Sequence, residues 1–253
     1  MSYQTLKVRY QDPVCFIQFY RPEANNTIND LLVEECLQAL TQYEQQATII
    51  VLEGLPEVFC FGADFKGMQQ SDNGHTANRQ GPEPLYDLWY KLATGPFITV
   101  AHVRGKANAG GIGFVAACDI VLAEEAAVFS LSELLFGLLP ACVMPFLIRR
   151  IGFQKAQYLT LMTKPVSVQQ AHSWGLVDAY EANSDSLLRT HLLRLRYLSK
   201  TGVVRYKKYM TRLADLAAAK PLALAANVEV FSDTDNLQRI ARYVQTGLFP
   251  WES

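Results

Sequence analysis

Two glycine-containing turns and one carboxylate are the residues of this chain best suited to chemistry. The first turn is FCFGAD at 59–64, the second is GKANAGGIG at 105–113, and Glu133 follows in the stretch LSEL. A turn that enters a helix leaves its first N–H groups unpaired and presents the positive end of the helix dipole. We expect the N–H groups of Ala63 and Gly110 to point at one carbonyl oxygen and to stabilise an enolate, by about 3 kcal/mol per donor.

Glu133 lies among apolar neighbours, in the sequence LSELLF at 131–136. Desolvation by such neighbours raises the pKa of a carboxyl group, and a carboxyl group with a raised pKa can both accept and return a proton. A structural role is the alternative, because Glu133 is equally suited to the first turn of a helix, paired with Ser130 or Ser132 in a cap. The two glycine turns favour the chemical interpretation.

Residues 111–116 (GIGFVA) also fit the G-x-G-x-x-A fingerprint of a dinucleotide site, and Glu133 follows about 20 residues later. That fingerprint needs a strand running directly into its first glycine and further βαβ units after it, which this sequence lacks. A tight strand-to-helix turn with close packing is the simpler interpretation. We therefore expect no nucleotide cofactor at these glycines.

Strands and helices around these turns must hold them in place. Residues 6–10 and 14–20 predict a hairpin, because β-branched and aromatic residues flank a turn signal. Asn29 is suited to cap a helix that ends near residue 46. Further strands are predicted at 48–52, 97–103, 119–123 and 128–130, with helices at 85–93 and from about 110.

After Ser132 the pattern becomes helical. Apolar spacing predicts helices at 146–151, 154–162, 168–174, 187–198, 203–213 and 222–231. Earlier in the chain, residues 69–84 are polar and rich in glycine and proline, which predicts a loop able to act as a lid over a neighbouring site.

The composition is that of an ordinary globular protein, and it argues against nucleic acid and membranes as binding partners. The chain has 253 residues, is 50% hydrophobic, has a mean hydropathy of +0.04 and carries a formal net charge of −1. Without an extended basic face, it offers little attraction to nucleic acid or to an anionic membrane. The N-terminus has no signal-peptide pattern, and the most apolar stretch, at 110–123, is too short to span a bilayer. The five dispersed cysteines are typical of reduced thiols, so we expect a cytoplasmic protein.

Three segments carry a resemblance that covers nearly the whole chain: RPEANNTIN at 21–29, FCFGAD at 59–64, and residues 103–120. The chain resembles the crotonase superfamily, also called the enoyl-CoA hydratase/isomerase superfamily. This resemblance implies an α/β protein with the crotonase fold, a spiral of ββα units followed by a helical region that builds trimers, often stacked into hexamers. We accordingly expect a spiral core at 1–190 and a C-terminal helical region at 191–253.

The resemblance also implies roles for particular residues. It places Ala63 and Gly110 at the two oxyanion-hole positions and Glu133 at the second of the two glutamates of a hydratase. The first glutamate is absent, because Gly113 occupies its position. This departure argues against ordinary hydration of straight-chain enoyl-CoA, although a single carboxylate serves proton transfer in the isomerases of the family.

A closer resemblance is to the enoyl-CoA hydratase homologues of polyketide gene clusters that install β-methyl branches, carried by residues 20–30, 106–111 and 131–137. It implies a dehydratase that removes water from 3-hydroxy-3-methylglutaryl-acyl carrier protein to give 3-methylglutaconyl-acyl carrier protein. Glu133 would remove the α-proton and then protonate the departing hydroxyl group on the same face. An isomerase or a decarboxylase acting on an acyl thioester, and a noncatalytic scaffold, remain alternatives.

A substrate of this kind needs further contacts. Gly62 permits its close approach to the first turn. Asp64 or Asn108 is suited to assist its hydroxyl group, since both flank the oxyanion hole, although Asp64 is also typical of a helix cap. Its free carboxylate calls for a cation or several donors. The candidates are Lys106, Arg104, Lys66 and His102.

Tyr86 and Trp89, spaced i, i+3, are suited either to wall the acyl pocket or to be plain core. The acyl group is expected on the phosphopantetheine of an acyl carrier protein or of CoA, with no metal and no other cofactor. The expected assembly is a homotrimer or hexamer. Basic residues of the helical part are suited either to an acidic carrier or to ordinary solvation, among them Arg149, Arg150, Lys155, Lys207 and Lys208.

Overall fold

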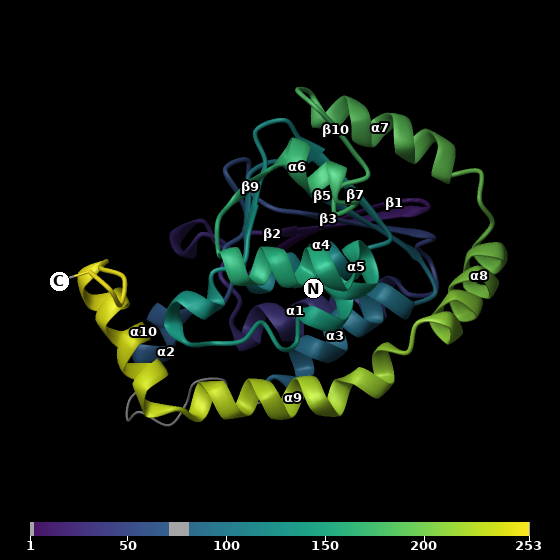
Figure 1. Cartoon of the computed structure of the whole chain (residues 1–253). Coiled ribbons are helices and arrows are strands. Elements are labelled where there is room, and N and C mark those ends of the chain that lie inside the picture. Colours follow the sequence, from purple (N-terminus) through teal and green to yellow (C-terminus); the bar gives the residue numbers. More distant parts are fainter. Residues whose placement is uncertain (1–2, 71–80, 253) are drawn as a thin grey trace.

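Runs of β-branched and aromatic residues build the main sheet. The structure is a computed structural model that describes residues 3–70 and 81–252. Within these residues, the main sheet has six strands in the order β1-β2-β3-β5-β7-β10 (Figure 1). β1 and β2 are antiparallel, whereas the other neighbours are parallel. The strands are β1 (Leu6–Gln11), β2 (Val14–Phe19), β3 (Ile49–Glu53), β5 (Ile98–Val103), β7 (Ile120–Glu124) and β10 (Ala179–Glu181).

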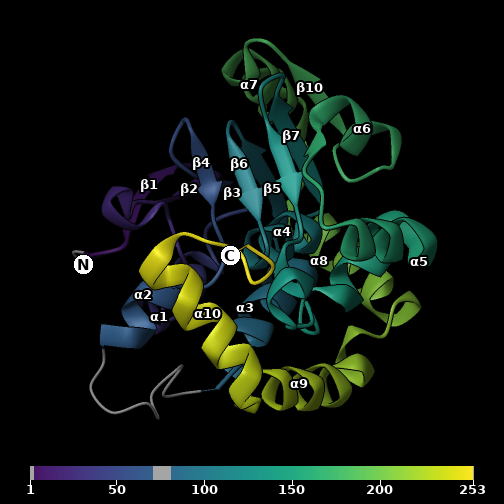
Figure 2. The same ribbon diagram turned by 60° about the vertical axis from the view of Figure 1, so that its left-hand side comes forward.

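A second, smaller sheet carries the glycine turns. In the described chain its strand order is β4-β6-β8-β9, and β4, β6 and β8 are parallel. Figure 2 shows β4 and β6 side by side. Because parallel strands end at the same edge of a sheet, the residues that follow β4, β6 and β8 lie close together. The strands are β4 (Val58–Cys60), β6 (Lys106–Asn108), β8 (Val128–Ser130) and β9 (Val166–Ser167).

Helices surround the two sheets. α8, α9 and α10 form an arc around one side of the molecule (Figure 1). The helices of the first half are η1 (Pro22–Ala24), α1 (Asp30–Tyr43), α2 (Phe65–Gln70), α3 (Glu83–Thr94), α4 (Gly110–Ala117) and η2 (Glu133–Phe136). Those of the second half are α5 (Met144–Met162), α6 (Val168–Ser173), α7 (Ser184–Leu195), α8 (Lys200–Leu213), α9 (Leu216–Ser232) and α10 (Thr234–Thr246).

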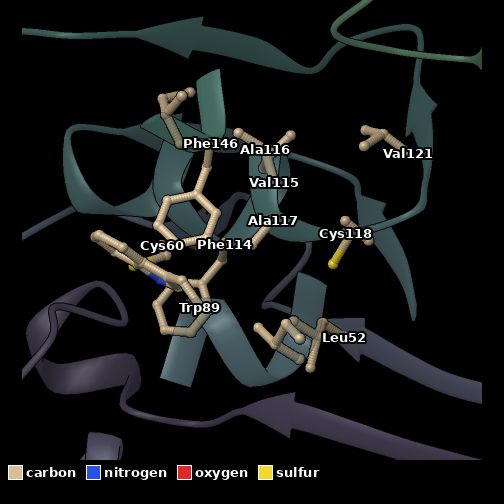
Figure 3. Close-up of a cluster of buried hydrophobic side chains, with 14 of the residues drawn as sticks. Leu52, Cys60, Trp89, Phe114, Val115, Ala116, Ala117, Cys118, Val121 and Phe146 are labelled. Atoms are coloured by element: carbon tan, nitrogen blue, oxygen red, sulfur yellow. The ribbon is translucent and has the colours of Figure 1, made fainter. Parts of the chain in front are cut away.

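The largest buried cluster surrounds α4, which is apolar on every side (Figure 3). Trp89 of α3 meets Phe114 of α4 at 5.8 Å and Phe146 of α5 at 6.0 Å between ring centroids. Aromatic pairs of this geometry contribute about 0.5–1.5 kcal/mol each beyond the area they bury. The cluster therefore fixes α3, α4 and α5 relative to one another, and with them the first residue of α4, Gly110.

Most of the predicted elements are present. Asn29 caps α1, since its side chain accepts a hydrogen bond from Leu32 N–H at 2.9 Å. The two helices predicted at 146–151 and 154–162 are the two parts of α5, which is interrupted at Gly152 with φ of 75°. No helix among the described residues is long and apolar enough to cross a membrane.

Some elements were not predicted. The strands β4, β6, β9 and β10 have two or three residues each, too few to show an alternating pattern. The last predicted helix ended at residue 231, and α10 follows it. The predicted loop at 69–84 lies largely at residues 71–80, outside the described residues, so its role as a lid stays a prediction.

Candidate active site

The first turn follows β4 and is fixed by a bridge to Ile28. Ile28 N–H donates to the Gly62 carbonyl at 2.7 Å, and Asp64 N–H donates to the Ile28 carbonyl at 3.0 Å. Because the residues on either side of Ala63 make both bonds of this parallel bridge, the N–H of Ala63 itself points to the opposite side. Gly62 has φ of +93°, a conformation that glycine adopts readily, and it lies against Ala109 of the second turn.

The second turn follows β6 and starts α4. Ala109 N–H donates to the Ser130 carbonyl at 3.0 Å, and Ala109 has φ of 51° and ψ of −122°. A residue with a side chain rarely adopts this region, and the strain is about 1–3 kcal/mol. The next N–H, that of Gly110, is the first of α4. A Cβ at Gly110 would lie 2.8 Å from Ile28 Cδ1, so a larger residue here would displace the end of the Ile28 side chain.

Ala63, Gly110 and Glu133 line one cavity of about 650 Å³. Among the hydrogen bonds of the described chain, neither the Ala63 N–H nor the Gly110 N–H has an acceptor. The two turns are in contact, since a Cβ at Gly62 would lie 3.5 Å from the Gly110 nitrogen. Two unpaired N–H groups on adjoining turns can bind one carbonyl oxygen and stabilise negative charge that develops on it.

Glu133 is the first residue of η2, shortly after β8. Its Oε2 is shielded from solvent and has no hydrogen-bond partner among the described residues. Desolvation raises the pKa of Glu133 from 4.5 to about 7, while the backbone N–H groups of Glu133 and Ser132 act in the opposite direction. A carboxyl group with this pKa can both accept and return a proton near neutral pH.

The turn that carries Glu133 is held by α10. Asn236 Nδ2 donates to the Gly137 carbonyl at 3.1 Å, and Gly137 ends η2 with φ of 77°. The rings of Phe136 and Tyr243 are 5.1 Å apart between centroids. Since Asn236 is buried, its amide anchors the end of η2 away from water. The sequence did not indicate these α10 residues as part of the site.

Gly113 lies on the side of α4 that faces Trp89. A Cβ at Gly113 would lie 2.4 Å from Trp89 Cζ2 and 2.6 Å from both Cε2 and Cη2. Trp89 is 1% exposed and is fixed by its neighbouring rings. The indole therefore fills the space that the side chain of a first glutamate would need. Trp89 also lines the cavity, so it is a core residue at the cavity wall, and its contact with an acyl group stays a prediction.

Three polar side chains line the same cavity beside Gly110 and Glu133: Asn108, Ser130 and Ser132. Ser130 Oγ donates to Asn108 Oδ1 at 2.7 Å. Ser132 Oγ lies 3.1 Å from Asn108 Nδ2 and 3.2 Å from Asn108 Oδ1. The side chain of Ser132 does not cap η2. The two serines had been considered only as cap partners of Glu133, whereas their hydroxyl groups bind Asn108.

Asp64 and Tyr86 lie outside the described lining of the cavity, contrary to their proposed contact with substrate. Asp64 Oδ1 accepts from Gly67 N–H at 2.9 Å, as a helix cap does, and its Oδ2 is 2.8 Å from the Arg21 guanidinium. Tyr86 is fully buried, and its hydroxyl donates to the Leu216 carbonyl at 2.6 Å. Asp64 is thus a structural cap, and Tyr86 is a core residue that ties α3 to α9. Gly62 shapes the turn without lining the cavity.

The four cationic candidates for a substrate carboxylate also lie away from the described lining. Lys106 and Lys66 are exposed. Arg104 donates to the Gly54 carbonyl at 2.8 Å. His102 is fully buried between Glu53, 3.2 Å from its Nδ1, and Ser184, 2.9 Å from its Nε2. The sequence places Lys106 and Arg104 just before the second turn, but their side chains do not reach the described lining of the cavity.

The charged residues of the described lining are two carboxylates, Asp30 and Glu133. Other polar groups in the lining are neutral, as in Asn108, Thr163 and Asn227. A substrate carboxylate in this cavity would therefore depend on several neutral donors rather than on an ion pair with a described residue.

The chain is similar to known proteins along its whole length. The chain is 62% identical over 254 residues to the bacillaene synthase dehydratase PksH of Bacillus subtilis (strain 168), covering 100% of this chain and 98% of the relative. The crystal structure of the B. subtilis polyketide biosynthesis enoyl-CoA hydratase PksH superposes with a TM-score of 0.95 at 62% identity, covering 98% of this chain and 100% of that one.

The fold extends to more distant proteins. An enoyl-CoA hydratase from Bacillus halodurans matches with a TM-score of 0.85 at 22% identity, over 94% of this chain and 99% of that one, which shows the shared crotonase fold. The sequence profile of the enoyl-CoA hydratase/isomerase family matches residues 9–253. With this match and the full-length relative, the chain belongs to the enoyl-CoA hydratase/isomerase family.

Proposed function

We propose that this enzyme is a hydro-lyase that removes water from 3-hydroxy-3-methylglutaryl-acyl carrier protein to give 3-methylglutaconyl-acyl carrier protein in polyketide β-branching. The observation that carries the proposal is one buried carboxyl group, that of Glu133, in the same cavity as the unpaired N–H groups of Ala63 and Gly110. The relative named as a dehydratase, 62% identical over the whole chain, supports the direction of the reaction.

The residues suit an elimination through an enolate. The thioester oxygen accepts hydrogen bonds from the Ala63 and Gly110 N–H groups, which acidifies the α-carbon and stabilises the enolate. The Glu133 carboxylate takes the α-proton and becomes a carboxylic acid. The C–O bond to the β-hydroxyl then breaks as the C=C bond forms, and Glu133 gives its proton to the departing oxygen, so that water leaves and the carboxylate is restored. A pKa of about 7 suits both halves of this exchange.

A second candidate is an isomerase that shifts a double bond in an acyl thioester. It uses the same enolate and one carboxylate, and the acidic character of the described lining favours an acyl group without a free carboxylate. A decarboxylase acting on the same class of thioester also shares the enolate. A noncatalytic scaffold would gain nothing from a strained turn at Ala109 and a carboxyl oxygen, Glu133 Oε2, that is shielded from solvent without a partner among the described residues, since both cost stability.

We propose an acyl carrier protein, through its phosphopantetheine thioester, as the partner that delivers the substrate. Three of the basic residues considered for carrier docking are engaged within the fold. Lys207 is 3% exposed and pairs with Asp119 at 2.6 Å, while Arg149 and Arg150 donate to backbone carbonyls. Of the five basic residues considered, Lys155 and Lys208 are exposed and are therefore the ones available to contact a carrier protein.

We propose a homotrimer, alone or stacked into a hexamer, as the assembly. Support comes from apolar side chains that α8 leaves exposed, among them Tyr206, Tyr209 and Leu213. Exposed apolar patches of this kind mark protein interfaces. Light scattering at several protein concentrations distinguishes monomer, trimer and hexamer. The cytoplasmic location and the lack of any metal or further cofactor stay predictions.

The proposed activity is tested by mass spectrometry of 3-hydroxy-3-methylglutaryl groups on an acyl carrier protein. The wild-type enzyme is expected to remove one water, and Glu133→Gln is expected to leave the acyl group unchanged. A 3-enoyl thioester, offered in parallel, reports isomerase activity. An unchanged hydroxyacyl group together with a shifted double bond would replace the dehydratase with the isomerase.

A further inference from the structure

We infer that Asn108, Ser130 and Ser132 form the binding site for the departing hydroxyl group of the substrate. This inference rests on the proposed dehydration, and it assigns a hydroxyl site that a single acid/base residue leaves open. In this site the serine hydroxyl groups touch the leaving oxygen, and Asn108 holds the serines in place.

The strands place these three residues together. Asn108 ends β6 and Ser130 ends β8, and the two residues are directly paired in the parallel ladder. Paired residues in a ladder direct their side chains to the same face of a sheet, and here that face borders the cavity. Ser132 follows two residues later and immediately precedes Glu133. The cluster therefore lies between the oxyanion-hole turn and the acid/base residue.

The position suits the stereochemistry of the reaction. A single carboxyl group that removes the α-proton and protonates the leaving oxygen must reach both on one face of the substrate. The site for the hydroxyl group must then adjoin Glu133. Ser132 is bonded to Glu133 through the backbone and lines the same cavity.

The hydrogen-bond capacity of the cluster matches an alcohol. Ser130 uses its proton toward Asn108 Oδ1, so its oxygen is left with lone pairs that can accept from a substrate hydroxyl. Ser132 accepts from Asn108 Nδ2 at 3.1 Å, and its own proton, which lies toward Asn108 Oδ1 at 3.2 Å, can turn to donate to the substrate instead. A tertiary alcohol has one proton to give and lone pairs to receive one, so it can bond to both serines at once.

Other groups in the cavity are less suited to bind the departing hydroxyl group of the substrate. At Gly113, where a typical hydratase of the family has its first glutamate, the Trp89 indole occupies the space. The hydroxyl groups of Thr163 and Ser232 already donate to the backbone carbonyls of Met162, at 2.7 Å, and Glu229, at 2.9 Å. The rival donor is Trp89 Nε1, which is buried without a partner among the described residues.

The test separates hydroxyl departure from enolate formation. Water loss is measured on the 3-hydroxy-3-methylglutaryl carrier protein, and enolate formation as α-proton exchange in deuterium oxide on the 3-methylglutaryl carrier protein, which lacks the hydroxyl group. Ser132→Ala and Ser130→Ala remove the serine oxygens, and Ser132→Thr restores one. Ser173→Ala is the matched control, because it removes the hydroxyl of an exposed serine outside the described lining of the cavity.

We expect Ser132→Ala and Ser130→Ala each to slow water loss by about tenfold to a hundredfold, the loss of one hydrogen bond to the reacting group, and to leave α-proton exchange unchanged. Ser132→Thr should recover water loss, and Ser173→Ala should match the wild type. The proposal is overturned if both serine variants eliminate water at the wild-type rate, or if exchange falls in parallel with elimination.

Two further results also decide against the cluster. A loss of elimination with intact exchange in Trp89→Phe alone would assign the hydroxyl group to the indole instead. A wild-type enzyme that exchanges the α-proton but never releases water would overturn both the dehydratase and its hydroxyl site. Wild-type water loss with unaffected serine variants overturns the hydroxyl site only, so the two failures are distinguishable.

Discussion

Replacing Glu133 with glutamine should abolish turnover and, at the same time, stabilise the folded protein above neutral pH. The folded state holds the Glu133 proton more tightly than the unfolded chain, because burial raises the pKa from 4.5 to about 7. The free energy of unfolding therefore falls as the pH rises through this window. At about 1.36 kcal/mol per pKa unit, the ionised carboxyl group costs the fold about 3 kcal/mol at pH values above the window. Glutamine has a similar shape and no such cost.

Thermal unfolding of the two proteins at about pH 5 and about pH 8 measures this effect. For a chain of this size, about 3 kcal/mol corresponds to a melting temperature higher by about 6–12 °C for Glu133→Gln at the higher pH, with a small difference at the lower pH. Glu229→Gln, an exposed site on α9, controls for the substitution itself. A difference that is the same at both pH values would refute the assignment of Glu133 as a buried, costly carboxylate. The rate of water loss by the wild type should rise with pH around a midpoint near 7, since the base is the ionised form.

Three further substitutions test how the site is positioned. Gly113→Ala should destabilise the protein by about 1–3 kcal/mol in urea unfolding, because its Cβ would meet Trp89 at 2.4 Å. In a Trp89→Leu background the same change should stabilise α4, and an equal effect in both backgrounds would contradict the clash. Ala109→Gly should raise the free energy of unfolding by about 1 kcal/mol by relieving strain at φ of 51°; a lower value would show that the turn is unstrained. Asn236→Ala should lower kcat about tenfold and shift the midpoint of the pH–rate profile downward, because the Gly137 end of η2 loosens and water reaches Glu133. An unchanged pH–rate profile would show that Asn236 contributes to stability alone.

The local patterns of the sequence were sufficient to predict most of the secondary structure. The long buried strands are rich in β-branched residues, and most of the helices show apolar spacing, so each of these elements is recognisable alone. Helix α10 could also have been predicted, because Asp233 caps it and Leu237, Ile240 and Val244 repeat at helical spacing. Of the short strands of the second sheet, β8 was predicted at 128–130. The strands β4, β6 and β9 could not be predicted, because their pairing depends on contacts between distant segments.

The backbone turns of the site could be predicted from the sequence, whereas the directions of most side chains could not. The glycine turns are visible in the sequence and locate Ala63 and Gly110, which line one cavity with Glu133 in the structure. Their chemical roles stay predictions. Whether Lys106 faces the cavity or the solvent depends on strand register, which the sequence leaves open. The contact between Gly113 and Trp89 likewise joins two helices and has no local signature.

The hydrogen bond between Asn236 and Gly137 joins positions 99 residues apart in the chain, and it bears on the order in which the protein matures. During synthesis the segment around Glu133 leaves the ribosome well before α10 exists. Until α10 docks, the aromatic face of Phe136 lacks Tyr243, and the Gly137 end of η2 lacks the Asn236 amide. The turn that carries Glu133 is therefore completed only when the last helix docks, so acquisition of activity should coincide with the final step of folding.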